Sequence, residues 1–334
     1  MLRLPAFTYR EPTTLAQALR MKAEAGPHGM YVAGGTDLYP NMKRRHQEPT
    51  TVISLARIKA LHRKPRVDPS TRQRVLSPMM TLTDVAANRT LRKHYPAVAT
   101  GADVISTPIL RNMGTLGGNL CLDTRCTYLN QSYEWRKAID FCMKKDGAIC
   151  WVAPSSPRCW AVQSSDLAPV MAALDAEYVL AGPDGERVVP AGQFYRNDGI
   201  DYLSKQADEL LTEVRLPALN GWDATYHKLR RRGAFDFPVL GVAAWIRWEG
   251  ATVAAARIVL GGVASWPQLV PESAAALVGT TLDDTAVEAA AQAAFKPSKP
   301  MDNTDFHLSW RKEMTRVWVR RALVELRTRH GRHA

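Results

Sequence analysis

Cysteine is absent from most of this 334-residue chain. All five cysteines fall within 39 consecutive positions, at Cys121, Cys126, Cys142, Cys150 and Cys159. Apolar runs of the roughly 18 to 20 residues that a membrane helix needs are also missing. The first 15 residues contain neither an apolar signal core nor a small-residue cleavage site. These absences predict a cytoplasmic protein that does not span a membrane and whose thiols stay reduced.

Nucleic-acid motifs are lacking as well, although the formal net charge is +12. The basic residues form small groups, at 43–45, 228–232 and 311–332, without zinc-finger spacing or an RNA-binding aromatic motif. We therefore interpret them as solvated faces and subunit contacts, and expect no nucleic-acid partner. A basic surface could also attract an acidic redox partner.

Catalytic constellations are missing too. The eight histidines are scattered without H-x-x-x-H spacing, and no nucleophile triad or pair of catalytic carboxylates is recognisable. Neither a G-x-G-x-x-G dinucleotide fingerprint nor a phosphate-binding P-loop occurs. The sequence therefore predicts that the substrate chemistry does not take place on this chain.

The hydrophobic pattern that is present indicates an α+β protein of two domains, 1–195 and 196–334. The β-α-β order near the start predicts a small mixed sheet, and the C-terminal part predicts an antiparallel sheet covered by helices. Helices are expected at 13–25, from 81, after 96, and at 166–174, 271–278, 284–294 and 307–329. Strands are expected at 30–33, 51–53, 177–181, 187–189, 210–216, 224–229, 239–248 and 251–260.

Two glycine pairs stand out against this background. Gly34-Gly35 and Gly117-Gly118 each follow a hydrophobic stretch and precede small polar residues. Glycine lets the backbone approach a ligand closely, because no Cβ is in the way. Two opposed turns of this kind can present N–H donors to both sides of a pyrophosphate. A single glycine pair is more often an ordinary turn.

The cysteine segment itself is open to three interpretations. Cys126, Cys142, Cys150 and Cys159 are spaced by 16, 8 and 9 positions, with Cys121 five residues earlier. Four thiolates suit either tetrahedral zinc or a [4Fe–4S] cluster, and the spacing cannot choose between them. The third interpretation is a small core of reduced cysteines packed among the segment's aromatic side chains, which could equally exclude water from a cluster.

The two glycine motifs, Ala33-Gly34-Gly35-Thr36-Asp37-Leu38 and Thr115-Leu116-Gly117-Gly118-Asn119, resemble the paired FAD-binding motifs of the molybdenum hydroxylase flavoproteins. The resemblance continues through Ser165-Asp166-Leu167-Ala168-Pro169 and, more loosely, after residue 200. It implies a two-subdomain FAD-binding fold of the vanillyl-alcohol-oxidase-like type. The implied flavin contacts are Val32, Ala33, Gly34, Gly35, Thr36, Asp37, Leu38, Thr115, Gly117, Gly118, Asn119, Ser165, Asp166, Leu211, Lys228 and Phe237.

Several of these residues also have a purely structural interpretation. Asp166 could simply cap the helix that it precedes. Leu211 and Phe237 could be core residues, and Lys228 could belong to a solvated basic run.

In flavoproteins of this family the second glycine motif normally reaches the Ser-Asp pair after a few residues, whereas here Asn119 and Ser165 are 46 positions apart. The extra segment, at about 121–163, resembles the insertion in the 4-hydroxybenzoyl-CoA reductase branch of the family. That resemblance implies a [4Fe–4S] cluster held by Cys126, Cys142, Cys150 and Cys159. Cys121 would be the spare thiol, packed as a small hydrophobe.

The same resemblance implies an electron-entry subunit. A ferredoxin-like donor would reduce the cluster, and FAD would pass the electrons to a [2Fe–2S] small subunit. A molybdopterin-binding large subunit would then remove the phenolic hydroxyl of 4-hydroxybenzoyl-CoA, with the complex a dimer of heterotrimers. The alternatives are the FAD subunit of an oxidative molybdenum hydroxylase and a zinc-stabilised scaffold subunit without catalytic function.

Overall fold

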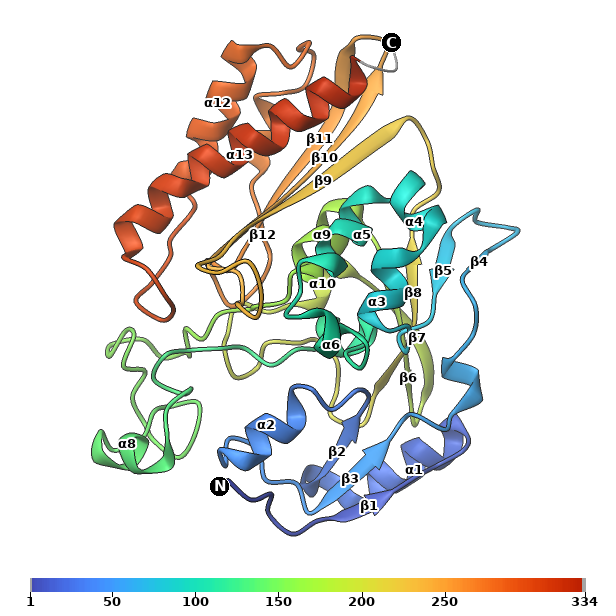
Figure 1. Ribbon diagram of the computed structural model, residues 1–334, viewed down its shortest axis with the longest axis vertical. Helices are drawn as coiled ribbons and strands as arrows, with labels where there is room; N and C mark the ends of the chain where they lie inside the picture. The colour runs from blue at the N-terminus through green and yellow to red at the C-terminus, as the bar shows by residue number, and fades with distance from the viewer. Residues whose placement is uncertain (1, 332–334) are drawn as a thin grey trace.

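Three sheets with their attached helices follow one another along the chain (Figure 1). The computed structural model describes residues 2–331. Within these residues, no helix combines the length and the apolar character needed to cross a bilayer.

The first sheet has the order β1-β3-β2 and is entirely parallel. The mixed sheet expected here was therefore wrong, because α1 and α2 each return the chain to the same end of the sheet. α1 begins after Thr14, whose side chain accepts the N–H of Gln17, and it ends at Gly26, whose φ is +54°. The elements of this subdomain are β1 (Thr8–Arg10), α1 (Leu15–Ala25), η1 (Gly26–His28), β2 (Gly29–Val32), α2 (Leu38–Lys43), β3 (Thr51–Ser54) and η2 (Lys59–Leu61).

The second sheet is antiparallel, with the order β4-β5-β8-β6-β7. Its strands are β4 (Arg66–Val67), β5 (Arg74–Leu76), β6 (Glu177–Gly182), β7 (Gly185–Pro190) and β8 (Leu210–Leu216). β8 has the predicted bounds but lies in this sheet, between β5 and β6, and not in the C-terminal sheet to which the expected boundary at 195/196 assigned it. A strand's hydrophobic pattern shows that it is buried, but not which strands it pairs with.

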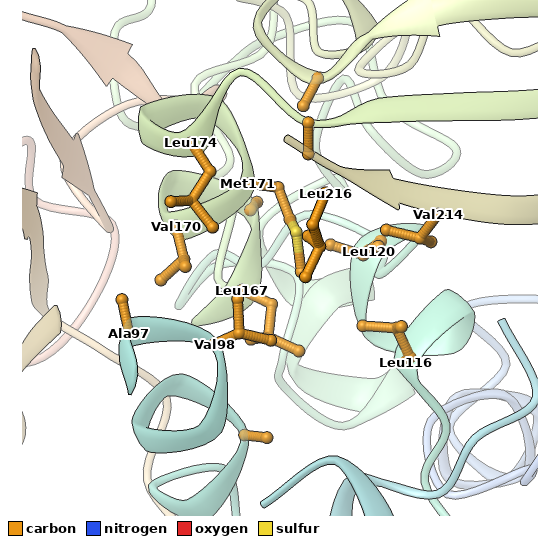
Figure 2. Close-up of a cluster of buried hydrophobic side chains, with 14 of the residues drawn as sticks. Ala97, Val98, Leu116, Leu120, Leu167, Val170, Met171, Leu174, Val214 and Leu216 are labelled. Carbon is orange, nitrogen blue, oxygen red and sulfur yellow. The ribbon is translucent and has the colours of Figure 1, made fainter. Parts of the chain in front are cut away.

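Eight short helices accompany the middle part of the chain. α9 is apolar on every side and is almost wholly buried, as expected for a helix inside a core. Figure 2 shows Leu167, Val170, Met171 and Leu174 of α9 packed with side chains of α5, α7 and β8. The helices are α3 (Leu82–Ala87), α4 (Arg89–His94), α5 (Pro96–Asp103), α6 (Pro108–Arg111), α7 (Leu116–Leu120), α8 (Tyr133–Ala138), α9 (Leu167–Leu174) and α10 (Ala191–Phe194).

The C-terminal sheet is antiparallel in the order β12-β11-β10-β9, and α12 and α13 lie across one face of it (Figure 1). Helices α5 and α9 of the preceding part contact the same sheet. The predicted antiparallel sheet covered by helices is thus confirmed. The elements are β9 (Trp222–Leu229), β10 (Leu240–Glu249), β11 (Thr252–Gly261), β12 (Gln268–Leu269), α11 (Pro271–Ala275), α12 (Asp284–Phe295) and α13 (Leu308–His330).

The cysteine segment is mostly turns around α8 and forms the lateral extension at α8 in Figure 1. It contacts both ends of the chain. Arg136 donates to the carbonyl of Arg44 at 3.1 Å, and Asn303 donates to the carbonyl of Trp160 at 2.6 Å. The segment is therefore tied to the rest of the fold and is not a free appendage.

Arg311 anchors α13 to the C-terminal sheet. Its guanidinium is completely buried and donates to the carbonyl oxygens of Val239, Gly262 and Met301, at 2.7 to 3.1 Å. Arg311→Met should lower the free energy of unfolding by about 3 kcal/mol, because three buried acceptors lose their donor. Arg321→Met, at an exposed position of the same helix, should change it by less than about 0.5 kcal/mol. Urea titrations of the two variants measure the difference, and equal losses would contradict this role for Arg311.

Candidate functional site

A large cavity of about 650 Å³ is lined by both glycine turns. Its walls come from β2 and α2 of the first subdomain, from α7, and from β8. A cavity of this size with mainly apolar walls is typical of a binding site for a sizeable organic ligand. Of the residues proposed as ligand contacts from the sequence, those that line it are Val32, Ala33, Gly34, Gly35, Thr36, Asp37, Leu38, Thr115, Gly117, Gly118, Asn119, Leu211 and Phe237.

The two turns touch each other. A Cβ on Gly34 would lie 1.8 Å from the carbonyl oxygen of Met113, just before the second turn. Gly35 has a φ of +70°, a conformation that glycine adopts without strain. Glycine is thus required at both positions of the first turn, once for close packing and once for its dihedral angle.

The second turn departs from the expectation that its N–H groups face a ligand. Gly117 donates its N–H to the carbonyl of Pro78 at 2.7 Å, and Gly118 donates to the hydroxyl of Thr115 at 3.1 Å. A Cβ on Gly117 would also lie 2.7 Å from Cβ of Pro78. Gly117 thus lets α7 pack closely against Pro78, and the N–H groups of both glycines are already engaged within the chain.

Ser165, Asp166 and Lys228 do not line this cavity. Ser165 donates its hydroxyl proton to Oδ1 of Asn119 at 2.7 Å, and so orients a side chain that does line it. Asp166 accepts from Tyr226 at 2.8 Å and from Nζ of Lys228 at 2.9 Å, in a pair whose side chains are 3% and 2% exposed. Burial raises the pKa of Asp166 and lowers that of Lys228, while the attraction between them opposes both shifts.

Arg125 was missed by the sequence analysis. It forms an ion pair with Asp37 and donates to Oδ1 of Asn41 at 2.9 Å. Its guanidinium carbon also lies 5.2 Å from the centroid of the Phe237 ring. Arg125 therefore joins the first glycine turn, the cysteine segment and the C-terminal domain, and nothing in the local sequence pattern singles it out.

Other residues of the large cavity were also missed. They are dispersed along the chain and carry no motif, so no sequence signal could have found them individually. Examples are Tyr31, Met79, Asp123, Tyr202 and Lys205.

Four cysteines meet at a second, much smaller cavity. Cys126, Cys142, Cys150 and Cys159 all line it, all are free thiols, and each is 5% to 7% exposed. Tight turns position them: the N–H of Leu129 bonds to the carbonyl of Cys126, and that of Lys145 to the carbonyl of Cys142. The chain thus brings together residues that are 33 positions apart.

Polar and steric features of this cavity suit sulfur ligands. The N–H of Ala161 donates to Sγ of Cys159 at 3.4 Å, and a Cβ on Gly199 would lie 2.7 Å from the same sulfur. Burial raises the pKa of Cys126 to about 12 and that of Cys159 to about 11. A positive charge from a bound metal group would be needed to hold these sulfurs as thiolates.

Cys121, expected to be a spare packed as a small hydrophobe, packs against the core around α9 and also lines the large cavity. Burial raises the pKa of its thiol. It lies outside the group of four, as expected.

Comparisons with known proteins identify the family of the chain. Residues 5–219 match the family described as the FAD-binding domain in molybdopterin dehydrogenase. Residues 224–326 match the C-terminal domain of the carbon monoxide dehydrogenase flavoprotein. The chain belongs to the FAD-binding subunits of the molybdenum hydroxylases. The gap between the two matches follows β8, in agreement with the place of β8 in the middle sheet.

Relatives resemble the chain along most of its length. The nicotine 6-hydroxylase medium subunit of Paenarthrobacter nicotinovorans is 26% identical over 97% of this chain and 98% of its own. The aldehyde oxidoreductase FAD-binding subunit PaoB of Escherichia coli is 29% identical over 79% of this chain and 83% of its own. A carbon monoxide dehydrogenase structure from Hydrogenophaga pseudoflava covers 98% of this chain and 99% of its own, with 27% identity and a TM-score of 0.80. The α+β fold expected from the sequence is confirmed.

Gly118 offers a direct test of whether FAD binds in the large cavity. A Cβ there would meet the Thr115 hydroxyl at 3.0 Å and no other heavy atom within 4 Å in the described chain. Gly118→Val should therefore narrow the cavity and weaken FAD binding about tenfold or more without unfolding the protein. Fluorescence titration of the deflavinated protein with FAD measures this. The control is Gly192→Val on α10, where a Cβ would have no described neighbour within 4 Å, and an equal loss in both variants would argue against the assignment.

The Asp166–Lys228 pair can be tested for a structural role against a role in flavin binding. Asp166→Asn should lower the free energy of unfolding by about 3 kcal/mol, because it leaves a buried ammonium group without its counter-ion. Asp166→Asn combined with Lys228→Met should recover most of that loss, and the folded variants should bind FAD with unchanged affinity. A loss of FAD affinity with unchanged stability would instead make Asp166 a flavin ligand.

Proposed function

We propose that this chain carries a [4Fe–4S] cluster beside its FAD and is the electron-transfer subunit of a molybdenum-containing 4-hydroxybenzoyl-CoA reductase. One observation carries the proposal: four of the five cysteines, all within one segment, line a single buried cavity. The resemblance of the segment to the insertion in 4-hydroxybenzoyl-CoA reductase supports the proposal that the subunit belongs to this enzyme.

The donor set fits a cluster of this kind. Four thiols with backbone N–H groups directed at the sulfurs, inside an apolar shell, are the features that hold and tune [4Fe–4S] centres. Met143, Trp151 and Val152 pack against the cysteines. The cavity is only about 10 Å³, room for one water molecule, so the cysteines must move apart when a cluster binds.

Zinc is the competing occupant. A tetrahedral zinc requires four sulfurs about 2.3 Å from one point. Within residues 2–331, no three His, Cys, Asp or Glu side chains are arranged to hold a single metal ion. A cubane binds each cysteine through a different iron, so the iron and zinc contents of the purified subunit distinguish the two occupants.

Bound FAD exchanges one or two electrons, which suits it to stand between a one-electron centre and a two-electron reaction. The chain's own part is to bind and space the two cofactors. Arg125 and Asn41 hold the carboxylate of Asp37 at the flavin cavity, and Ser165 holds Asn119 there. The cysteine cavity lies in the segment that Arg125 connects to this wall.

The proposed partners are a molybdopterin-binding large subunit, a [2Fe–2S] small subunit and a ferredoxin-like donor in the cytoplasm, in a dimer of heterotrimers. The designation of the nicotine 6-hydroxylase relative as a medium subunit supports a multi-subunit complex. The five free cysteines are consistent with a reducing compartment.

An oxidative function is the alternative, and the names of the relatives favour it, since they include an aldehyde oxidoreductase and a nicotine hydroxylase. Turnover by the complete complex distinguishes the two directions. With a reduced low-potential donor, 4-hydroxybenzoyl-CoA should take up two electrons and two protons and yield benzoyl-CoA and water. Oxidation of an aldehyde or N-heterocycle, with no turnover of the thioester, would establish the alternative.

The cluster itself is tested on the purified subunit. Anaerobically prepared protein should contain about four irons per FAD and show a [4Fe–4S] EPR signal after dithionite reduction. Cys142→Ser should abolish that signal and leave FAD in place, whereas Cys121→Ser should retain both. Zinc without iron, or a signal that persists in Cys142→Ser, would contradict the proposed ligand set.

A further inference from the structure

A charge pair spans the wall between the two cavities. Lys144 lines the cysteine cavity, and Asp123 lines the flavin cavity. Nζ of Lys144 lies 2.8 Å from Oδ1 of Asp123. The cation therefore faces one proposed cofactor and the carboxylate faces the other.

The surroundings hold both side chains in place. Lys144 also donates to the carbonyl of Gly199 at 2.5 Å, and its ammonium group lies 5.3 Å from the centroid of the Tyr202 ring. The second oxygen of Asp123 accepts from Gln47 at 3.1 Å. The side chains of Lys144 and Asp123 are only 9% and 16% exposed, so water and salt screen the two charges weakly.

Gly199 connects this pair to a cysteine. The N–H of Gly199 donates to the carbonyl of Cys159 at 2.9 Å, and its Cα packs against the sulfur of that residue. A single hydrogen-bonded path thus leads from the Cys159 backbone through Gly199 and Lys144 to Asp123.

We propose that the Lys144–Asp123 pair sets the difference in reduction potential between the cluster and the flavin. This inference rests on the proposed cluster. Reduction adds negative charge to a cluster, so the nearby ammonium group stabilises its reduced form and raises its potential. The carboxylate of Asp123 disfavours negative charge on the flavin and lowers the flavin potential. With a cluster of lower potential than the flavin, the pair narrows the gap and keeps electron exchange between the two centres reversible.

Lys145 provides a matched control. It is adjacent in sequence and has the same charge, but it pairs with Glu48 and Asp146, at 3.5 Å each, and lines neither cavity. A general effect of removing one positive charge from the segment would appear in both lysine variants, whereas the proposed effect would appear in one.

The experiment is a redox titration of the FAD- and iron-loaded subunit, followed by EPR for the cluster and by visible absorbance for the flavin. Lys144→Met should lower the equilibrium constant for cluster reduction about tenfold, which is a shift of about 59 mV for one electron. Lys144→Arg and Lys145→Met should leave the cluster potential near that of the unmodified protein. Asp123→Asn should raise the flavin potential.

The outcomes separate this inference from the proposed function. Unmodified protein that binds FAD but no iron would remove the cluster, and with it the proposed function. Iron-loaded Lys144→Met with an unshifted potential, or a shift of equal size in Lys145→Met, would overturn the role of Lys144. If Lys144→Met fails to retain iron, the flavin potential of Asp123→Asn is compared with that of the unmodified protein. An equal potential in the two proteins would overturn the inference.

Discussion

The hydrogen bond between Ser165 and Asn119 closes the neck of the cysteine segment. It joins two side chains that are 46 positions apart, at the exit from the second glycine turn and at the start of α9. The backbone bridge between Arg125 and Val162 continues the closure a few residues further out. Because both ends of the segment are held at the wall of the flavin cavity, the cysteines between them fold beside that cavity. The spatial relation between the two proposed cofactors follows from this constraint.

Cations attach the segment to the rest of the protein. Arg125 reaches Asp37, Arg136 reaches the carbonyl of Arg44, and Lys144 reaches the carbonyl of Gly199. Arg136 is almost fully buried, between the rings of Tyr133 and Phe141. Some of the basic side chains that contribute to the +12 net charge therefore make contacts inside the protein, where a charged group requires defined partners. These three residues lie outside the basic groups interpreted as solvated faces and subunit contacts, whereas Lys228 and Arg311 belong to those groups and are buried.

The sequence predicted local structure well where one pattern decides it. α1 begins at a capping threonine and ends at a glycine, and β8, β10 and β11 coincide with apolar-rich stretches. The predicted bounds of these four elements therefore agree with the structure to within two residues. Pairing could not be predicted in the same way, because β8 is buried in whichever sheet it joins. The glycine turns were located from their own residues, whereas Arg125 and Lys144 matter only through partners that lie elsewhere in the fold.

The site residues that also had a purely structural interpretation fall into two groups, those that line the large cavity and those that pair with each other. Leu211 and Phe237 line the large cavity, although each could have been an ordinary core residue. Asp166 and Lys228 satisfy each other instead, at the contact between α9 and β9. A sequence shows that an acidic and a basic residue are present, but not that they are 2.9 Å apart, and that distance shows that each already has a charged partner.

The position of the segment explains how an additional redox centre could be accommodated without rebuilding the fold. The segment leaves the fold after α7 and returns to it before α9, and both helices pack in a core that the four clustered cysteines do not join. Lengthening a loop that is already closed adds little entropy cost, since each doubling of length costs only about 0.6 kcal/mol. The segment then forms its own small apolar cluster around the cysteines. Polar contacts of Lys144 link this cluster to the large cavity, because Lys144 lines the cysteine cavity while its ion-pair partner Asp123 lines the large one.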